Sequence, residues 1–150
     1  MILFLSKDNN LSLMAEAIYE KATNQNAQSV GFDEGEYFNQ NAIKVLMDNG
    51  VIIDKAPKVV DEFEVSKADV ILTMTEAQKM TLTYMLPAYQ AKIKTIREWA
   101  GKRGNVNEPY FDTENTYKTI YKELEKLINA GEKLQRKGFF GSLRNRKKFF

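Results

Sequence analysis

The sequence predicts an α/β fold in which an open sheet of four parallel strands lies between two layers of helices. Three observations lead to this prediction. Residues 1–5 are apolar and precede a polar turn and a helical pattern, and this strand–loop–helix unit is typical of open parallel sheets. Residues 70–74 form a largely apolar run, which is typical of a central strand buried on both faces. Strands then alternate with helices, which implies right-handed crossover connections.

Local patterns predict the other elements in chain order. Helices are expected at residues 11–22, 41–49, 76–85 and 113–129, and further strands at residues 28–32 and 92–98. Gly50 is placed to end the second helix, and Thr75 is a good N-cap for the third. The last helix is predicted from apolar residues that recur three and four positions apart. These residues are Tyr117, Ile120, Tyr121, Leu124, Leu127 and Ile128.

Composition excludes several kinds of chemistry. The chain has 150 residues, enough for one domain with a sizeable core, and contains neither cysteine nor histidine. It therefore has no disulfide, no thiol nucleophile, and neither the commonest general base nor the usual zinc ligand. The acidic clusters at residues 33–34 and 61–64 are interpreted as solvated surface, so we predict no metal and no cofactor. The N-terminal apolar run is too short for a signal sequence or a membrane span, and we expect a cytoplasmic protein.

Charge is distributed unevenly and divides the chain in two. Residues 1–132 contain 15 basic and 20 acidic residues, whereas residues 133–150 contain 7 basic residues and no acidic one. We therefore predict an acidic domain over 1–132 and a basic tail over 133–150. Tail residues expected to bind are Arg136, Lys137, Phe139, Phe140, Arg144, Arg146, Lys147, Lys148, Phe149 and Phe150. Such a segment suits an anionic membrane surface, RNA or an acidic protein, with a disordered solubilising end as the alternative.

Four stretches carry a resemblance to a known family. They are Met14-Ala-Glu-Ala17 preceded by Ser12, Gly50-Val-Ile-Ile-Asp54, Ala68-Asp-Val-Ile-Leu-Thr-Met-Thr-Glu76 and Trp99-Ala-Gly101. The chain resembles the low-molecular-weight protein tyrosine phosphatases, a family that also includes arsenate reductases of the same fold. The resemblance covers residues 1 to about 130 and implies the strand order 2-1-3-4.

The resemblance also implies where a catalytic loop would lie. The family's first strand runs into a Cys-x5-Arg-Ser loop. Counting back from Met14 places the nucleophile position at Leu5 and the phosphate-binding arginine position at Leu11. Lys7 stands at the usual glycine position, where its Cβ would resist a positive φ. The vestigial loop comprises Ser6, Lys7, Asp8, Asn9, Asn10, Leu11 and Ser12. Glu108, followed by Pro109 and Tyr110, replaces the family's Asp-Pro-aromatic acid.

These replacements favour a pseudophosphatase, a catalytically inactive homologue acting as a binding or regulatory module. Leu5 and Leu11 are expected to fill the empty anion site with apolar bulk, a redesigned apolar ligand pocket being the alternative reading. A second hypothesis is an active phosphatase or esterase that uses Ser6, Ser12 and Glu108, although a serine nucleophile needs a base beside it. A third is an adaptor, peripheral at a membrane or bound to nucleic acid through the tail.

Overall fold

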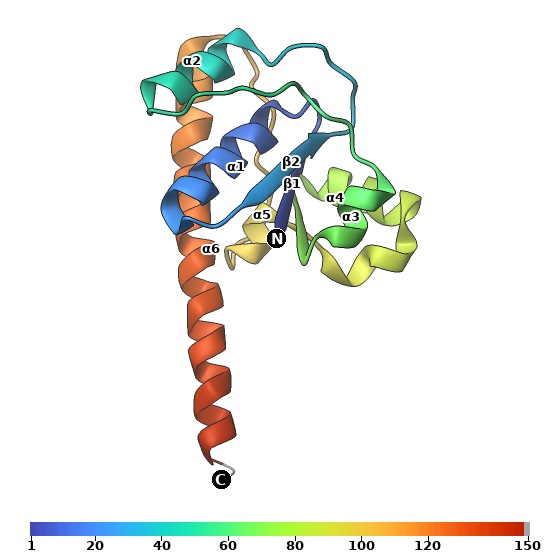
Figure 1. Cartoon of the computed structure of the whole chain (residues 1–150), viewed down its shortest axis with the longest axis vertical. Helices are drawn as coiled ribbons and strands as arrows, with labels where there is room; N and C mark the ends of the chain where they lie inside the picture. Colours follow the sequence, from blue (N-terminus) through green and yellow to red (C-terminus); the bar gives the residue numbers. More distant parts are fainter. Residues whose placement is uncertain (149–150) are drawn as a thin grey trace.

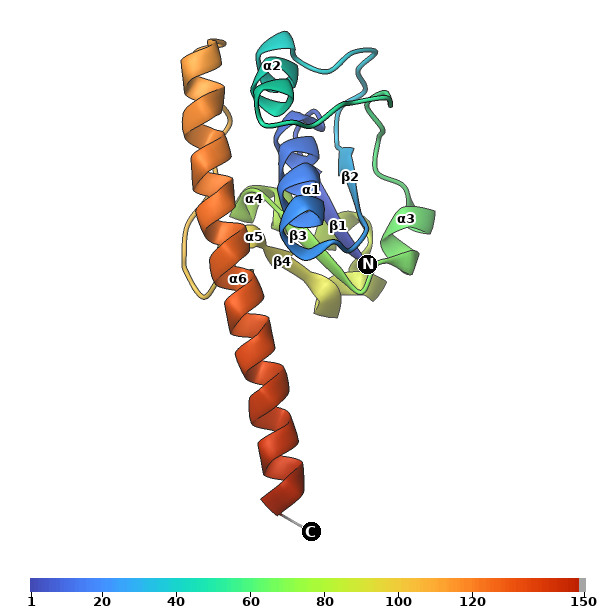
Figure 2. The same cartoon turned by 60° about the vertical axis from the view of Figure 1, so that its left-hand side comes forward.

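The computed structural model describes the backbone of residues 1–148 and the side chains of residues 1–138. A four-stranded parallel sheet forms the centre of the body, and helices cover both of its faces, as Figure 1 and Figure 2 show. The strands are β1 (Ile2–Ser6), β2 (Ala27–Gly31), β3 (Val70–Thr73) and β4 (Ile93–Thr95). The helices are α1 (Asn10–Thr23), α2 (Gln40–Asp48), α3 (Glu62–Lys67), α4 (Glu76–Met85), α5 (Ile96–Trp99) and α6 (Glu114–Lys148), with the 3₁₀ helix η1 (Pro87–Lys92).

The strand order is β2-β1-β3-β4, which confirms the predicted topology. Ile2 of β1 pairs with Ala27 of β2 on one side and with Val70 of β3 on the other, and all neighbouring strands are parallel. In a parallel sheet the carboxyl ends of all strands meet at one edge, where ligands bind in this class of fold. The loop between β1 and α1 leaves the sheet at the centre of that edge.

Each face of the sheet has its own hydrophobic cluster. Along β1, Ile2 and Phe4 pack in the cluster beneath α1, α2, α5 and α6, whereas Leu3 and Leu5 pack in the cluster beneath α3 and α4. Such alternation is expected because successive strand side chains point to opposite faces. The central strands are therefore buried on both faces, as the apolar runs predicted.

Helix-end signals are largely confirmed. Helix α4 begins at Glu76 as expected, and Thr75 caps it through a hydrogen bond from the backbone N of Gln78, which completes a capping box. Gly50 has a φ of +79°, as a C-terminal glycine should. Three short elements were not foreseen, namely α3, α5 and η1.

The fourth strand is shorter than predicted. It ends at Thr95, and residues 96–99 form α5 instead of extending the strand to 98. The cause is a second capping box, in which Thr95 Oγ1 accepts from the backbone N of Glu98 at 3.0 Å and Glu98 Oε1 accepts from the backbone N of Thr95 at 3.2 Å. Two reciprocal hydrogen bonds thus turn an extended run into a helix.

The last helix is longer than predicted. Helix α6 continues from Glu114 to Lys148 and passes through the expected end at 129, so the predicted boundary at residues 132 and 133 lies inside it. Gly131 lies within the helix and directly against Trp99: a Cβ there would be 2.1 Å from the indole ring. Gln135 Nε2 also donates to the carbonyl of Trp99 at 3.2 Å. The helix thus remains attached to the body at least as far as Gln135.

No helix within the described residues is long and apolar enough to cross a membrane.

Candidate functional site

The loop after β1 packs directly against β2. The backbone N of Phe32 donates to the carbonyl of Ser6 at 3.1 Å, and that of Asp33 donates to the carbonyl of Lys7 at 2.8 Å. Gly31 permits this contact, because a Cβ there would be 2.6 Å from the backbone N of Asn9. The end of β2 and the two residues that follow it therefore fix the loop in place.

A buried chain of uncharged side chains closes the loop from within. The backbone N of Ser12 donates to Ser6 Oγ at 3.1 Å, and Ser6 Oγ donates to Ser12 Oγ at 2.8 Å. Ser12 Oγ donates onward to the carbonyl of Val30 at 2.9 Å. Asn9 Nδ2 donates to Ser12 Oγ and to Ser29 Oγ, each at 3.0 Å. These polar groups satisfy one another, so the network forms without a ligand.

Asn9 is the residue that makes the tight turn, a role that the sequence analysis missed. Its φ is 70°, and it and Asn24 are the non-glycine residues with a positive φ in the described backbone. Lys7, whose Cβ was expected to resist such a conformation, does not adopt it. Asn9 Oδ1 also accepts from the backbone N of Lys58 at 2.9 Å. The asparagine thus joins the loop to β2 and to the segment around Lys58, a combination that spacing alone does not reveal.

Leu5 and Leu11 do not fill one common site. Leu5 lies within β1 and is fully buried in the cluster that includes Ile71 and Leu82, on the α3 and α4 face. Leu11 is fully buried in the cluster on the opposite face. The expectation that both leucines occupy an empty anion site is therefore wrong. Ser6 is the residue of β1 whose side chain bonds the first turn of α1.

Carboxylates gather around the loop. Lys7 forms an ion pair with Asp33 at 2.9 Å, and Asp8 Oδ1 accepts from the backbone N of Asn10 at 3.2 Å. Burial, followed by the negative charge of Asp8, raises the pKa of Glu108 to about 7, and its Oε1 is buried without a hydrogen-bond partner. Within this group, Lys7 opposes three carboxyl groups. The electrostatic environment therefore disfavours a bound anion.

The rim of the site is fixed by Asp112. Asn39 Nδ2 and Asn41 Nδ2 each donate to Asp112 Oδ1 at 2.9 Å, and these bonds hold the pKa of the Asp112 carboxyl below its usual range. Beside it, Tyr110 and Phe111 are exposed and pack edge to face, with ring centroids 5.3 Å apart. The loop after Glu108 is thereby tied to the start of α2.

Glu108 is expected to make the stability of the folded protein depend on pH. Its folded pKa lies above the ordinary 4.5, so its contribution to stability is fully present below about pH 4.5 and is lost as pH rises through about 7. Glu108→Gln should remove this effect. Relative to the unchanged protein, the variant should gain about 1–2 kcal/mol in free energy of unfolding between pH 5 and pH 8, allowing for partial solvent screening. Urea unfolding at both pH values measures the gain, and Glu34→Gln, at an exposed residue, should show little of it. An equal gain in both variants would contradict the assignment.

No activated nucleophile is visible at the site. Ser6 and Ser12 are fully buried, and their hydroxyl groups bond to each other, to Asn9 and to backbone groups, not to a carboxylate or an amine. Glu108 is not a hydrogen-bond partner of either serine. Among the described residues, no group of three or more carboxylate side chains is placed to hold a metal ion.

The tail residues are described only in part. Arg136 and Lys137 are exposed on α6. The side chains of Phe139, Phe140, Arg144, Arg146, Lys147, Lys148, Phe149 and Phe150 lie outside the described residues.

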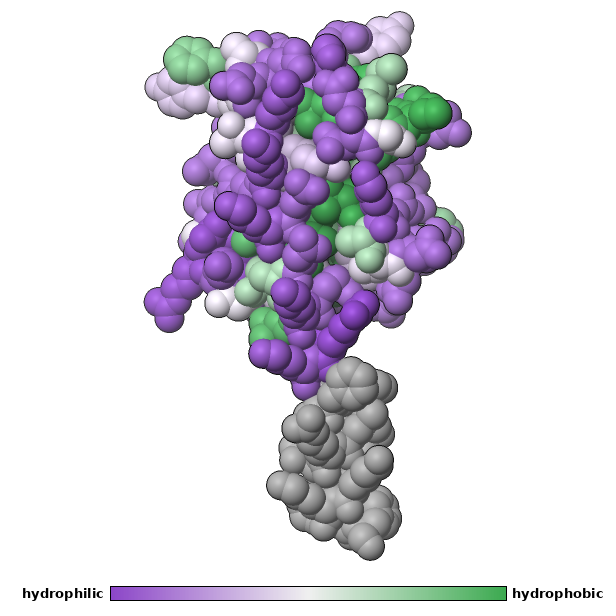
Figure 3. Space-filling model, turned by 90° about the vertical axis from the view of Figure 1, so that its left-hand side faces the viewer, coloured by the Kyte–Doolittle hydropathy of each residue, from purple (hydrophilic) through white to green (hydrophobic). Residues whose placement is uncertain are grey.

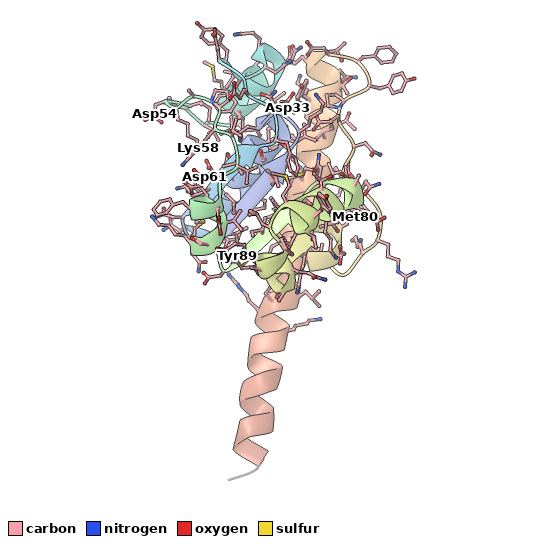
Figure 4. All side chains as sticks on the ribbon, turned by 90° about the vertical axis from the view of Figure 1, so that its right-hand side faces the viewer. Asp33, Asp54, Lys58, Asp61, Met80 and Tyr89 are labelled. Carbon is pink, nitrogen blue, oxygen red and sulfur yellow. The ribbon has the colours of Figure 1, made fainter. Side chains whose placement is uncertain are left out.

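Figure 4 places Asp33 and Lys58 in the half of the body away from the projecting end of α6, whereas Tyr89 lies in the half from which α6 projects. The loop and the C-terminal part of α6 are thus at opposite ends of the molecule.

Comparisons with known proteins agree with this geometry. Residues 1–138 match the family model for low molecular weight phosphotyrosine protein phosphatase. The protein-arginine-phosphatase of Bacillus subtilis (strain 168) is 24% identical over 136 residues, covering 85% of this chain and 91% of that protein. The low molecular weight protein tyrosine phosphatase from T. tengcongensis is 34% identical with a TM-score of 0.78, covering 86% of this chain and 95% of that one.

A second similar structure is a mutant of the YwlE arginine phosphatase with a phosphorylated active-site serine. It is 26% identical with a TM-score of 0.81, covering 89% of this chain and 95% of that one. The chain therefore belongs to the low molecular weight phosphotyrosine protein phosphatase family, although its sequence contains no cysteine that could serve as the nucleophile of the family's loop.

Proposed function

We propose that this chain is a pseudophosphatase, an inactive member of its family that acts as a binding or regulatory module. The observation that carries the proposal is the closed network of Ser6, Asn9 and Ser12 in a loop without cysteine. In this network Ser6 Oγ accepts a hydrogen bond from the backbone N of Ser12. Backbone N–H groups at a helix N-terminus can otherwise bind an anion. The loop also lacks an arginine, and Lys7 is held by Asp33.

Electrostatics supports the same proposal. A phosphate group would approach Asp8 and Glu108, and the carboxyl of Glu108 is about half ionised near pH 7. A neutral Glu108 could donate a proton to a leaving group, but an acid contributes only about 10²–10⁴-fold and requires an attacking group. Loss of a nucleophile can cost about 10⁶-fold.

Turnover assays test the proposal. Purified protein should hydrolyse p-nitrophenyl phosphate, a phosphotyrosine peptide and a phosphoarginine peptide no faster than Ser6→Ala does. The Bacillus subtilis protein-arginine-phosphatase provides a positive control for the phosphoarginine peptide. Turnover that persists through repurification and disappears in Ser6→Ala would overturn the proposal.

A second candidate function, an active phosphatase with rearranged groups, is favoured by one comparison. In the similar YwlE mutant the active-site serine is phosphorylated, so a serine in this fold can carry the phosphoryl group. Ser6 lies at the end of β1 and bonds the first turn of α1. Against this candidate, Ser6 is fully buried and has no base among its hydrogen-bond partners. Mass spectrometry after incubation with phosphoarginine peptide separates the two functions: a phosphate on Ser6 supports the enzyme, and an unmodified chain supports the pseudophosphatase.

A further inference from the structure

Helix α6 has two parts with different surroundings. Its first part presents apolar residues to the body, ending with Leu127 and Ile128, and Gly131 is still buried under Trp99. All residues from 133 to 138 are exposed. In Figure 1 and Figure 2 the helix continues well past the body as a single straight projection. Thirteen residues of the helix follow Gln135, up to its end at Lys148, a length of about 20 Å.

The projecting part carries the positive charge of the molecule. Residues 133–150 contain 7 basic residues and no acidic one, whereas residues 1–132 have a balance of −5. Arg136 lies 4.0 Å from Glu132, an ion pair made within the helix at its base. Salt at physiological ionic strength screens electrostatic interactions over about 8 Å. The negative charges of the body therefore have little effect on the cations at the far end of the helix. The end of α6 is thus a cationic element held away from an anionic body.

In the projecting part of α6, the helical register places apolar residues on one side and small or polar residues on the other. At about 100° per residue, Phe139, Phe140 and Leu143 occupy register positions within about 100° of one another. Gly138, Gly141 and Asn145 occupy positions on the opposite side. Lys137, Arg144 and Lys148 lie together at one border of the apolar stripe, and Arg146 lies at the other. Arg136 and Lys147 lie in line with the stripe, one before and one after it, so its apolar part is confined to residues 139–143.

We propose that residues 136–148 of α6 bind the surface of an anionic phospholipid membrane. A helix with a narrow Phe- and Leu-containing stripe bordered by cations is the pattern of an interfacial helix, in which the apolar side enters the headgroup boundary and the cations contact lipid phosphates. A helix also satisfies its own backbone hydrogen bonds, as the interface requires. Binding to RNA would use the cations and stacked aromatic rings, but it would not require an apolar stripe containing leucine.

Geometry lets this contact and the loop act independently. The loop between β1 and α1 lies at the end of the body away from the projecting helix, as the position of Asp33 in Figure 4 shows. The face of the body in Figure 3 is mainly hydrophilic, with apolar residues in separate patches. A membrane-bound α6 would therefore leave the loop end displaced from the lipid contact along the helix axis.

Co-sedimentation of the full chain with vesicles tests the proposal. The protein should bind phosphatidylcholine vesicles that contain phosphatidylserine, should not bind pure phosphatidylcholine, and should lose binding as salt rises. The variant Arg144→Gln, Arg146→Gln, Lys147→Gln, Lys148→Gln should bind at least about 100-fold more weakly at low salt. The variant Phe139→Gln, Phe140→Gln, Leu143→Gln keeps every charge and should bind about tenfold more weakly.

A matched control lies on the other side of the same helix. Ser142→Ala with Asn145→Ala should leave vesicle binding unchanged, and circular dichroism checks that each variant stays helical. A titration with a fluorescent single-stranded RNA, run in parallel, distinguishes membrane binding from RNA binding. Absence of binding to anionic vesicles would overturn the proposal, as would equal binding by the unchanged protein and the charge variant. Tight RNA binding that is insensitive to the apolar substitutions, with weaker vesicle binding, would overturn it in favour of a nucleic-acid contact.

Discussion

Asn9→Ala is expected to lower the free energy of unfolding by about 3–4 kcal/mol. The side chain donates to the buried Ser12 and Ser29 and accepts from the part-buried backbone N of Lys58. Its loss breaks all three hydrogen bonds and removes the donor that reaches Ser12 and Ser29 in the buried network, where an unsatisfied group costs about 1–3 kcal/mol. Alanine would also have to adopt a φ of 70°, which costs about 1–2 kcal/mol. Urea denaturation measures the change.

Asn24 provides the matched control for this experiment. It is also an asparagine in the left-handed region, with a φ of 58°, but it is exposed and its side chain makes none of these bonds. Asn24→Ala should therefore cost only the conformational part, about 1 kcal/mol. Asn9→Gly keeps the conformation and loses the side chain, so its cost should fall between the two alanine variants. Equal losses for Asn9→Ala and Asn24→Ala would show that the buried network contributes nothing.

The central part of the fold could be predicted because its signals are local. The apolar runs at β1 and β3 and the capping signal of Thr75 each lie within a few neighbouring residues, and the structure confirms them. The end of β4 was missed because residues 93–96 look like a continuing strand, whereas the reciprocal bonds between Thr95 and Glu98 begin a helix. The continuation of α6 was missed because the apolar stripe that predicts the helix ends at Ile128, whereas the contact of Gly131 with Trp99 lies beyond it.

The loop could be located from the sequence, but its internal geometry could not. Counting from Met14 placed Leu5 at the nucleophile position, yet adjacent strand residues point to opposite faces, so one residue decides whether a side chain meets the core or the loop. The structure places Leu5 in the core and directs Ser6 to α1. The network also depends on Ser29 and Lys58, which lie 20 and 49 residues from Asn9. No local spacing brings such partners together.

The contacts of the loop determine whether the family's catalytic groups could be restored by substitution. If only the catalytic side chains were lost, the anion-binding loop would keep its shape, and replacing Leu5 and Leu11 would restore the site. Here Leu11 is part of the core cluster beneath α1, Ser6 bonds the backbone of Ser12, and Asp8 brings a negative charge beside Glu108. The loop is therefore stabilised in a form that needs no ligand. Reversal would have to alter packing as well as chemistry.

Leu11→Arg is expected to destabilise the protein by about 4 kcal/mol or more and to create no phosphate site. Leu11 is fully buried in the cluster with Phe4 and Leu124. A guanidinium there would be desolvated without a paired carboxylate, and an uncompensated buried charge typically costs about 3–5 kcal/mol, in addition to the strain of overpacking. Leu11→Met is the volume-matched control and should cost less than about 1.5 kcal/mol. Urea unfolding compares the two variants, and thermal unfolding with and without phosphate tests for a site, because a ligand of the native state raises the melting temperature. A Leu11→Arg protein that stays as stable as Leu11→Met and melts higher in phosphate would show that the side chain turns out of the core and into the loop.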